Sequence, residues 1–291
     1  MDEDLRFAED LPRTAQDAFY LAGRLCVLCR NIHAVRPYIR LSRGSTGMEG
    51  EMSGIGPVMA DVLGTGRHRI LIAGALDTGI LACVARAAEG YRAEIVVLDI
   101  CATPLELCRK YAQRWSLHIE TVCEDLAHFE RERDFDIVLI DGTLPYIPEH
   151  SRIETLRRVA RALHQDGRLV LLFKTGERTA DGLAAQNTDG APQAVISELH
   201  RLGVALPEPE EAFAARLKDF ARGSAAHTDA FSSPEEVDAL LDSAGFVIEI
   251  RRQIDVDRAR PRKNVVARNS AQRYLVVASR KTDRSVAGCS A

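Results

Sequence analysis

The segment from residue 69 to residue 99 constrains the fold of this chain more than any other part of it. The segment runs RILIAG, a turn ALDTG, the helical pattern ILACVARAAEGY, and AEIVVLDI, in which Asp99 follows the apolar run. This order predicts a strand, a glycine-containing turn, a helix and a second strand. In open α/β sheets an acid about 20 residues beyond such a turn binds ribose hydroxyls. Asp99 lies 20 residues after Gly79, so the pattern predicts a nucleoside cofactor.

Composition limits the remaining possibilities. The chain has 291 residues, 46% of them hydrophobic and 27% charged, which suits one large α/β domain with additions or two small domains. The net charge of -4 argues against nucleic acid as a partner. No apolar run reaches the roughly 20 residues that span a bilayer, and the acidic first twelve residues do not resemble a secretory signal. We therefore expect a cytoplasmic protein without a membrane partner, and a homodimer remains open.

The rest of the chain continues the alternation of strands and helices. Two helices are expected over residues 14–39, the second broken or ended near Pro37, and a glycine-rich hinge or lid over residues 42–57. A helix capped by Thr103 is expected over residues 104–115. Further strands are expected at 118–125, 135–141, 168–173 after a turn at 165–167, 246–254 and 273–280, and further helices at 151–163, 194–204, 210–223 and 234–244. Residues from about 174 to 228 interrupt the alternation with a loop-like stretch and the two helices within 194–223, and this predicts an insertion on one face of the sheet.

Four landmarks resemble one known family. They are ILIAGALDTGILA, VVLDICATPLELCRKYA, FDIVLIDG and LHQDGRLVLLF, and their spacing is similar to that of the class I S-adenosylmethionine-dependent methyltransferases. The resemblance implies a doubly wound, mostly parallel seven-stranded α/β sheet of the Rossmann-like methyltransferase fold, with an antiparallel last strand. It implies amino-terminal helices and a lid over 1–66, a cofactor-binding domain over 67–280 with a helical insertion at 174–228, and a disordered tail over 281–291.

The resemblance also implies which residues contact the cofactor, S-adenosyl-L-methionine. The family's D-x-G-x-G-x-G motif corresponds to residues 73–79, where only the last glycine matches, and cofactor contacts are expected there from Gly74, Ala75, Asp77 and Gly79. Asp99 corresponds to the acid that binds the ribose, and Ile100 to the residue that packs on adenine. Asp125 and Asp141 correspond to acids that contact the adenine amino group and the methionine moiety or substrate. The alternative for Asp99, Asp125 and Asp141 is that each is an ordinary solvated carboxylate.

Candidate residues for the methyl acceptor lie beyond the strand ends and in the amino-terminal segment. Tyr146 and His33 are candidate catalytic residues, His33 as a base. Arg36, Tyr38 and Lys174 are candidate substrate-binding residues, Arg36 as a carboxylate clamp. The alternatives are a surface tyrosine packed by prolines and ordinary charged loop residues.

Two further groups of residues, one of cysteines with a histidine and one of basic residues, are candidates for a metal site and a nucleic-acid site. Cys26, Cys29 and His33 offer three zinc ligands, but on one helix they would simply share a face, and no second Cys/His pair is nearby. We therefore predict packing and no metal. Cys83, Cys101, Cys108 and Cys123 are expected to be small buried hydrophobes, reduced in the cytosol. A basic run over residues 258–268 is expected to be a solvated loop, with an RNA acceptor as the alternative.

The favoured function is methyl transfer from S-adenosyl-L-methionine to a small-molecule acceptor in biosynthesis, because a lid and an insertion would enclose a modest substrate. One alternative is a noncatalytic or repurposed protein of the same fold, a binding partner or an enzyme of non-methylating chemistry. Another is an NAD(P)-dependent oxidoreductase, against which G-x-G-x-x-G is absent.

Overall fold

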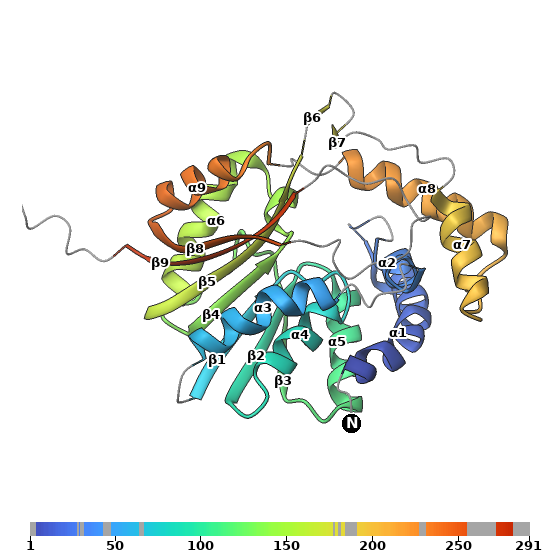
Figure 1. Cartoon of the computed structure of the whole chain (residues 1–291), viewed down its shortest axis with the longest axis horizontal. Coiled ribbons are helices and arrows are strands. Elements are labelled where there is room, and N and C mark those ends of the chain that lie inside the picture. The colour runs from blue at the N-terminus through green and yellow to red at the C-terminus, as the bar shows by residue number, and fades with distance from the viewer. Residues whose placement is uncertain are drawn as a thin grey trace, which may run out of the picture.

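A seven-stranded mixed sheet organises the protein (Figure 1). The computed structural model describes residues 4–27, 29, 32–42, 48–63, 67–176, 178–179, 182–183, 191–226, 231–254 and 272–281. The strand order is β3-β2-β1-β4-β5-β9-β8. The bounds are β1 Arg67–Ala73, β2 Arg92–Asp99, β3 Ile119–Cys123, β4 Phe135–Asp141, β5 Leu163–Thr175, β8 Phe246–Ile254 and β9 Gln272–Arg280. A separate two-stranded sheet pairs β6 Arg178–Thr179 with β7 Gly182–Leu183.

The pairing of the strands confirms the predicted topology. Strands β1 to β5 pair in parallel, whereas β9 is antiparallel to both β5 and β8. The near-continuous apolar strands arise because both faces of the sheet are covered. In β4, Ile137 and Leu139 face one hydrophobic core, and Val138 and Ile140 face the other. The carboxyl ends of the parallel strands consequently meet at one edge, where ligands bind in such sheets.

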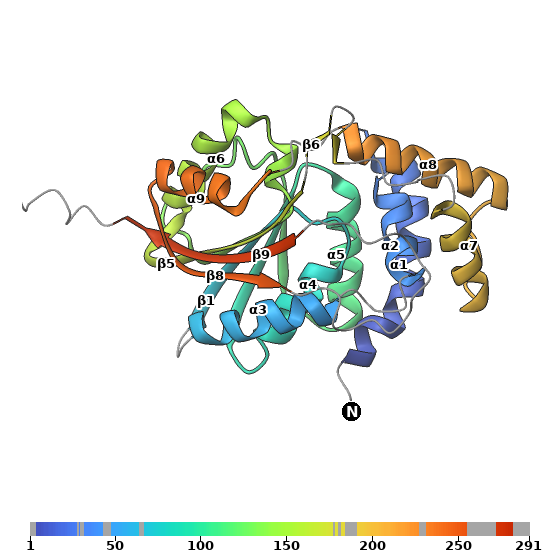
Figure 2. The same ribbon diagram turned by 45° about the horizontal axis from the view of Figure 1, so that its top comes forward.

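Helices cover the two faces of the sheet separately (Figures 1 and 2). Helices α3 Met48–Val62, α4 Gly79–Ala87 and α5 Ala102–Arg114 pack on the first face. Helices α6 Glu149–Ala162 and α9 Pro234–Ser243 pack on the second. None of the helices in the described part of the chain is both long and apolar enough to cross a membrane.

A third group of helices lies beside the sheet, at the right of both ribbon views. It comprises α1 Asp4–Leu25, α2 Ile32–Ser42, α7 Ala191–Arg201 and α8 Glu210–Ala226, which share a third hydrophobic core. The insertion was predicted on a face of the sheet, and this expectation was wrong. Its helices α7 and α8 pack on α2 instead, because their apolar residues meet those of α2.

The structure corrects two expectations for the amino-terminal segment. Helix α2 continues through Pro37 to Ser42, although Pro37 lacks the N–H that would bond to the carbonyl of His33. Most of the glycine-rich segment, from Met48 onward, belongs to helix α3 rather than to a hinge. In both cases burial of apolar side chains outweighs local propensity: Val35 and Ile39 are buried in α2, and Ile55, Val58 and Met59 in α3.

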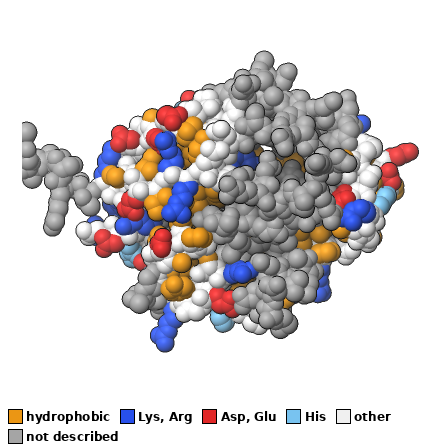
Figure 3. All heavy atoms as spheres, viewed as in Figure 1, with side chains coloured by type: hydrophobic (Ala, Val, Ile, Leu, Met, Phe, Trp, Pro, Cys, Tyr) orange, Lys and Arg blue, Asp and Glu red, His pale blue; other side chains and the backbone are white. Residues whose placement is uncertain are grey.

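Smaller differences concern single residues. Helix α5 begins at Ala102 with Cys101 at its N-cap, so Thr103 is inside the helix and is not the cap. Cys83, Cys101 and Cys108 are buried as predicted, but Cys123 is exposed. The basic run at 258–268 and the tail from residue 282 lie outside the described residues. On the face drawn in Figure 3, acidic, basic and hydrophobic side chains intermix over the described atoms.

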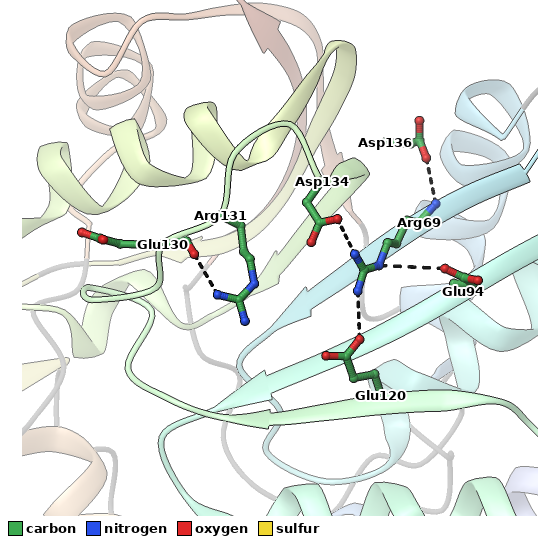
Figure 4. Close-up of polar contacts among 7 residues, drawn as sticks. All are labelled: Arg69, Glu94, Glu120, Glu130, Arg131, Asp134 and Asp136. Carbon is green, nitrogen blue, oxygen red and sulfur yellow. Dashed lines mark hydrogen bonds and ion pairs between the residues drawn. The ribbon is translucent and has the colours of Figure 1, made fainter.

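An ion-pair network holds the opposite, amino-terminal ends of the central strands together (Figure 4). The guanidinium of Arg69 on β1 contacts Asp134 and lies 2.9 Å from Glu120 on β3. The backbone N–H of Arg69 donates to Asp136 on β4 at 2.7 Å. These charged residues lie in the first three residues of their strands or just before a strand. The network is therefore at the end of the sheet opposite the carboxyl edge.

Buried Arg152 on α6 secures the loop that follows β4. Its Nε donates to the carbonyl oxygens of Leu144 at 3.2 Å and Ile147 at 3.0 Å, and its guanidinium lies 5.1 Å from the centre of the Phe231 ring. Leu144 is the first residue of the 3₁₀ turn Leu144–Tyr146, and Ile147 follows its last residue. Arg152 thereby fixes the position of Tyr146 at the carboxyl edge.

We expect Arg152→Met to destabilise the fold by about 2–4 kcal/mol, because it removes the charge-assisted hydrogen bonds to the carbonyls of Leu144 and Ile147. Urea unfolding measures the loss. The control is Arg157→Met on the same helix, whose side chain is 52% exposed, and which should change stability by less than about 0.5 kcal/mol. Equal losses in the two variants would contradict this role of Arg152.

Candidate functional site

The candidate site begins at the turn between β1 and α4. Gly74 has φ +89, a conformation that favours glycine, and a Cβ there would overlap Thr143 Oγ1 from the loop after β4. Thr143 Oγ1 donates to the carbonyl of Ala73 at 3.0 Å. The turn after β1 and the loop after β4 are therefore packed directly against each other, with Gly74 at the contact.

Asp99 joins this turn to the end of β2. One carboxylate oxygen accepts the backbone N–H of Ala75 at 2.8 Å, and the other accepts that of Cys101 at 2.7 Å. Burial raises the pKa of Asp99, although the two N–H groups favour its charged form. Each carboxylate oxygen can accept a further hydrogen bond. Beside it, Ile100 is a large apolar side chain with 52% exposure.

Asp77 occupies a position where the family motif has glycine, and it forms a buried ion pair with Arg40 of α2. Nε of Arg40 lies 2.9 Å from Oδ2 of Asp77, and the two side chains are only 9% and 1% exposed. Asp77 also accepts the N–H of Gly79 at 2.8 Å. Burial alone would raise the pKa of Asp77, but the charges of Arg40 and Arg36 hold it below its ordinary value. A Cβ at Gly79 would lie 2.8 Å from Arg40 Nη2, so this glycine leaves room for the ion pair.

Arg36 of α2 acts electrostatically on two residues of this region. Its charge acts to lower the pKa of both Asp77 and Tyr146. Burial raises the pKa of Tyr146, with Arg36 opposing the rise. The phenol is therefore protonated at neutral pH and suits donation of a hydrogen bond better than removal of a proton.

The other predicted acids and Lys174 have local partners or face solvent. Asp141 at the end of β4 accepts a hydrogen bond from Arg273 of β9 at 2.8 Å. Asp125 accepts the N–H of Ala127 at 2.9 Å, which stabilises the turn after β3. Lys174 is exposed near the end of β5, in register with Arg273.

Cys26, Cys29 and His33 do not share a helix face, and that expectation was wrong. Helix α1 ends at Leu25 and α2 begins at Ile32, so both cysteines lie in the connection. Buried His33 has its Nδ1 2.8 Å from the carbonyl oxygen of Leu76 in the β1–α4 turn, and it faces Cys101. Burial alone would lower the pKa of His33, but the hydrogen bonds to Cys101 and Leu76 raise it.

Tyr38 is fully buried, and its ring packs edge-on against Phe213 of α8 with 5.2 Å between ring centres. The structure thus places this predicted substrate-binding residue in the packing between α2 and the insertion. Burial raises the pKa of Tyr38 to about 12.

Sequence reasoning missed two residues of the site, Arg40 and Arg273. It also assigned Cys101 to packing alone and missed its contacts with Cys26, Cys29 and His33. The charged Asp77 in a glycine motif was a signal that a cation must lie nearby, because an unpaired buried carboxylate is costly. No signal in the sequence identified which of the many arginines supplies it.

Comparisons with known proteins agree with this geometry. A family model described as a methyltransferase domain matches residues 75–167, from the β1–α4 turn into β5. The matched part contains Asp99 and runs from α4 through β2, α5, β3, β4 and α6 to the start of β5. The chain therefore contains a region similar to a methyltransferase domain, on a Rossmann-like methyltransferase fold.

Similarity to individual family members is distant. Over 98 residues the chain is 29% identical to a carboxy-S-adenosyl-L-methionine synthase of Glaesserella parasuis serovar 5, a match that covers 33% of this chain and 40% of that protein. A Burkholderia thailandensis 1,6-didemethyltoxoflavin-N1-methyltransferase, solved with S-adenosylhomocysteine, has a TM-score of 0.51 at 16% identity over 79% of this chain and 78% of the other. A geranyl diphosphate C-methyltransferase from Streptomyces coelicolor A3(2) has a TM-score of 0.51 at 11% identity, covering 78% and 80%. These structures establish the methyltransferase fold.

We expect Arg40→Met to destabilise the protein by about 3–5 kcal/mol near neutral pH, because it leaves the buried carboxylate of Asp77 without its closest cation. Urea unfolding measures this loss. In the wild type, the lowered pKa of Asp77 adds stability above its unfolded pKa of about 3.9, and this stability is lost as the pH falls through the folded value. In the variant burial raises that pKa, so its deficit should shrink on acidification. The double variant Arg40→Met/Asp77→Asn should recover most of the loss, and no recovery would contradict the pairing.

Proposed function

We propose that this chain is an S-adenosyl-L-methionine-dependent methyltransferase acting on a small-molecule acceptor. The observation that carries the proposal is the carboxylate of Asp99, bound to the N–H groups of Ala75 and Cys101 at the carboxyl edge of a methyltransferase-fold sheet. A carboxylate in this position is suited to accept both hydroxyls of a ribose.

The residues present fit the nucleoside half of the cofactor. Each oxygen of Asp99 already accepts one N–H and retains capacity for one hydroxyl. Ile100 offers an exposed apolar surface on which adenine would pack, and Asp125, 39% exposed, lies at the end of the neighbouring strand. When bound, the cofactor supplies a methyl group that is already activated, so the protein's contribution is orientation and exclusion of water.

The methionine half would lie near the Asp77–Arg40 ion pair and Arg36. Asp77 would repel the cofactor's carboxylate if it stood alone, but Arg40 neutralises it within the buried pair. Arg36, whose charge acts on both Asp77 and Tyr146, is the cation that we assign to this part of the site. This arrangement favours an anionic group, either the carboxylate of the cofactor or that of the acceptor.

Tyr146 is the residue we assign to the acceptor. It is 44% exposed on the loop after β4, and its raised pKa keeps it protonated. It would orient the acceptor by donating a hydrogen bond. His33, the other candidate base, faces the thiols, and Lys174 would contribute charge at the outer rim.

We expect Asp99→Asn to weaken binding of S-adenosyl-L-methionine and of its demethylated product by about 10- to 100-fold, because the side chain loses its charge and only one of its two terminal atoms can still accept a hydrogen bond. Isothermal titration of both ligands against the folded variant measures the effect. Asp61→Asn, at an exposed carboxylate on α3, is the matched control. Unchanged affinity in a folded Asp99→Asn protein would refute the ribose assignment.

A second candidate is non-methylating chemistry on the same cofactor, which the match to carboxy-S-adenosyl-L-methionine synthases favours. The two functions predict different ligands on the purified chain. Mass spectrometry of the small molecules released by acid should find S-adenosyl-L-methionine or S-adenosylhomocysteine if the chain transfers methyl groups. Carboxy-S-adenosyl-L-methionine would instead support the second candidate.

A further inference from the structure

A cluster of three thiols and one imidazole lies next to the candidate site. Cys26 and Cys29 come from the α1–α2 connection, His33 from the first turn of α2, and Cys101 from the N-cap of α5. One ligand atom from each of the four residues lies within 4.8 Å of all the others. Three separate segments of the chain thus bring soft ligands to one point.

The spacing of the sulfur atoms is that of ligands around one metal ion. Sγ of Cys101 lies 3.7 Å from Sγ of Cys26 and 3.6 Å from Sγ of Cys29. Tetrahedral zinc with Zn–S distances of about 2.3 Å holds its sulfur ligands about 3.8 Å apart. A disulfide needs about 2.05 Å between its sulfur atoms, and here Cys101 is equally near two partners. We propose that Cys26, Cys29, His33 and Cys101 bind one zinc ion in a closed, four-coordinate structural site.

The orientation of His33 supports this assignment. Its Nδ1 lies 2.8 Å from the carbonyl oxygen of Leu76, and because a carbonyl only accepts, Nδ1 carries the proton. Nε2 is then the nitrogen with a lone pair for the metal. Zinc-bound histidines characteristically donate their other ring N–H to a carbonyl or carboxylate in this way.

The position of Cys101 in the fold favours a thiolate. Cys101 is at the N-terminus of a helix of 13 residues, where the macrodipole stabilises negative charge. Thr103 Oγ1 lies 3.1 Å from Sγ of Cys26 and can donate to it. Soft sulfur ligands with one imidazole in a tetrahedral arrangement select zinc over magnesium or calcium.

Zinc here would connect the amino-terminal helices to the nucleoside end of the site. Cys101 is two residues after Asp99, and His33 is bonded to Leu76 inside the β1–α4 turn. The ion would fix the start of α2, and with it Arg36 and Arg40, against that turn. This role is structural and independent of whether the chain transfers methyl groups.

We expect the full chain, purified without chelators and dialysed, to retain about one zinc per chain by plasma mass spectrometry. Cys29→Ser and Cys101→Ser should each lower the retained zinc to below a tenth of that value. Cys123→Ser, at an exposed cysteine outside the cluster, should retain it fully. Cobalt(II) bound in place of zinc should show thiolate charge-transfer absorption and the visible bands of a tetrahedral site.

A second test uses the wild-type chain, so its result does not depend on whether the variants fold. Alkylation followed by peptide mapping should find Cys26, Cys29 and Cys101 at least tenfold less reactive with zinc than after chelation, while exposed Cys123 reacts equally in both states. The proposal fails if the wild type retains no zinc and binds none from a zinc-buffered solution. It also fails if iron and sulfide are found in place of zinc, or if the three cysteines react alike with and without zinc.

Discussion

The carboxylate of Asp99 is the interaction on which the candidate site depends. It accepts one backbone N–H from the turn after β1 and one from the turn after β2, and so sets the relative position of the two turns. Gly74 reinforces the junction by donating to the carbonyl of Leu98 at 2.8 Å. These hydrogen bonds orient the carboxylate of Asp99 before any ligand binds. Binding therefore loses less conformational entropy of this side chain.

The amino-terminal helix α2 supplies side chains that contact the β1–α4 turn of the site. Helix α2 contributes Arg40 to the buried pair with Asp77, and it places His33 against the same turn. Helix α2 is in turn held by the insertion, since Tyr38 packs on Phe213 in the third hydrophobic core. The insertion therefore acts on the site indirectly, through the helix that it supports. This chain of contacts explains how a motif with aspartate in place of glycine remains compatible with the fold.

Much of the architecture could be predicted from the sequence, because strands buried on both faces and amphipathic helices leave strong periodic patterns. The apolar run of β4 and the acid at the end of β2 are examples, and both lie where expected. Two failures, at α2 and α3, share one cause. Pro37 and the glycines of residues 42–57 signal breaks locally, yet α2 and α3 continue because their apolar faces are buried against other elements. Propensity is a weak guide where tertiary burial compensates.

The sequence by itself determined the order of strands and helices, the topology that follows from it, and the presence of an acid at the end of β2. Only the tertiary structure decided which distant side chains meet: Asp77 with Arg40, Asp141 with Arg273, and Cys101 with Cys26 and Cys29. The physical reason is that periodicity reports which face of an element is buried, whereas a specific contact depends on how whole elements pack. Spacing along the chain carries no information about a partner 37, 75 or 132 residues away.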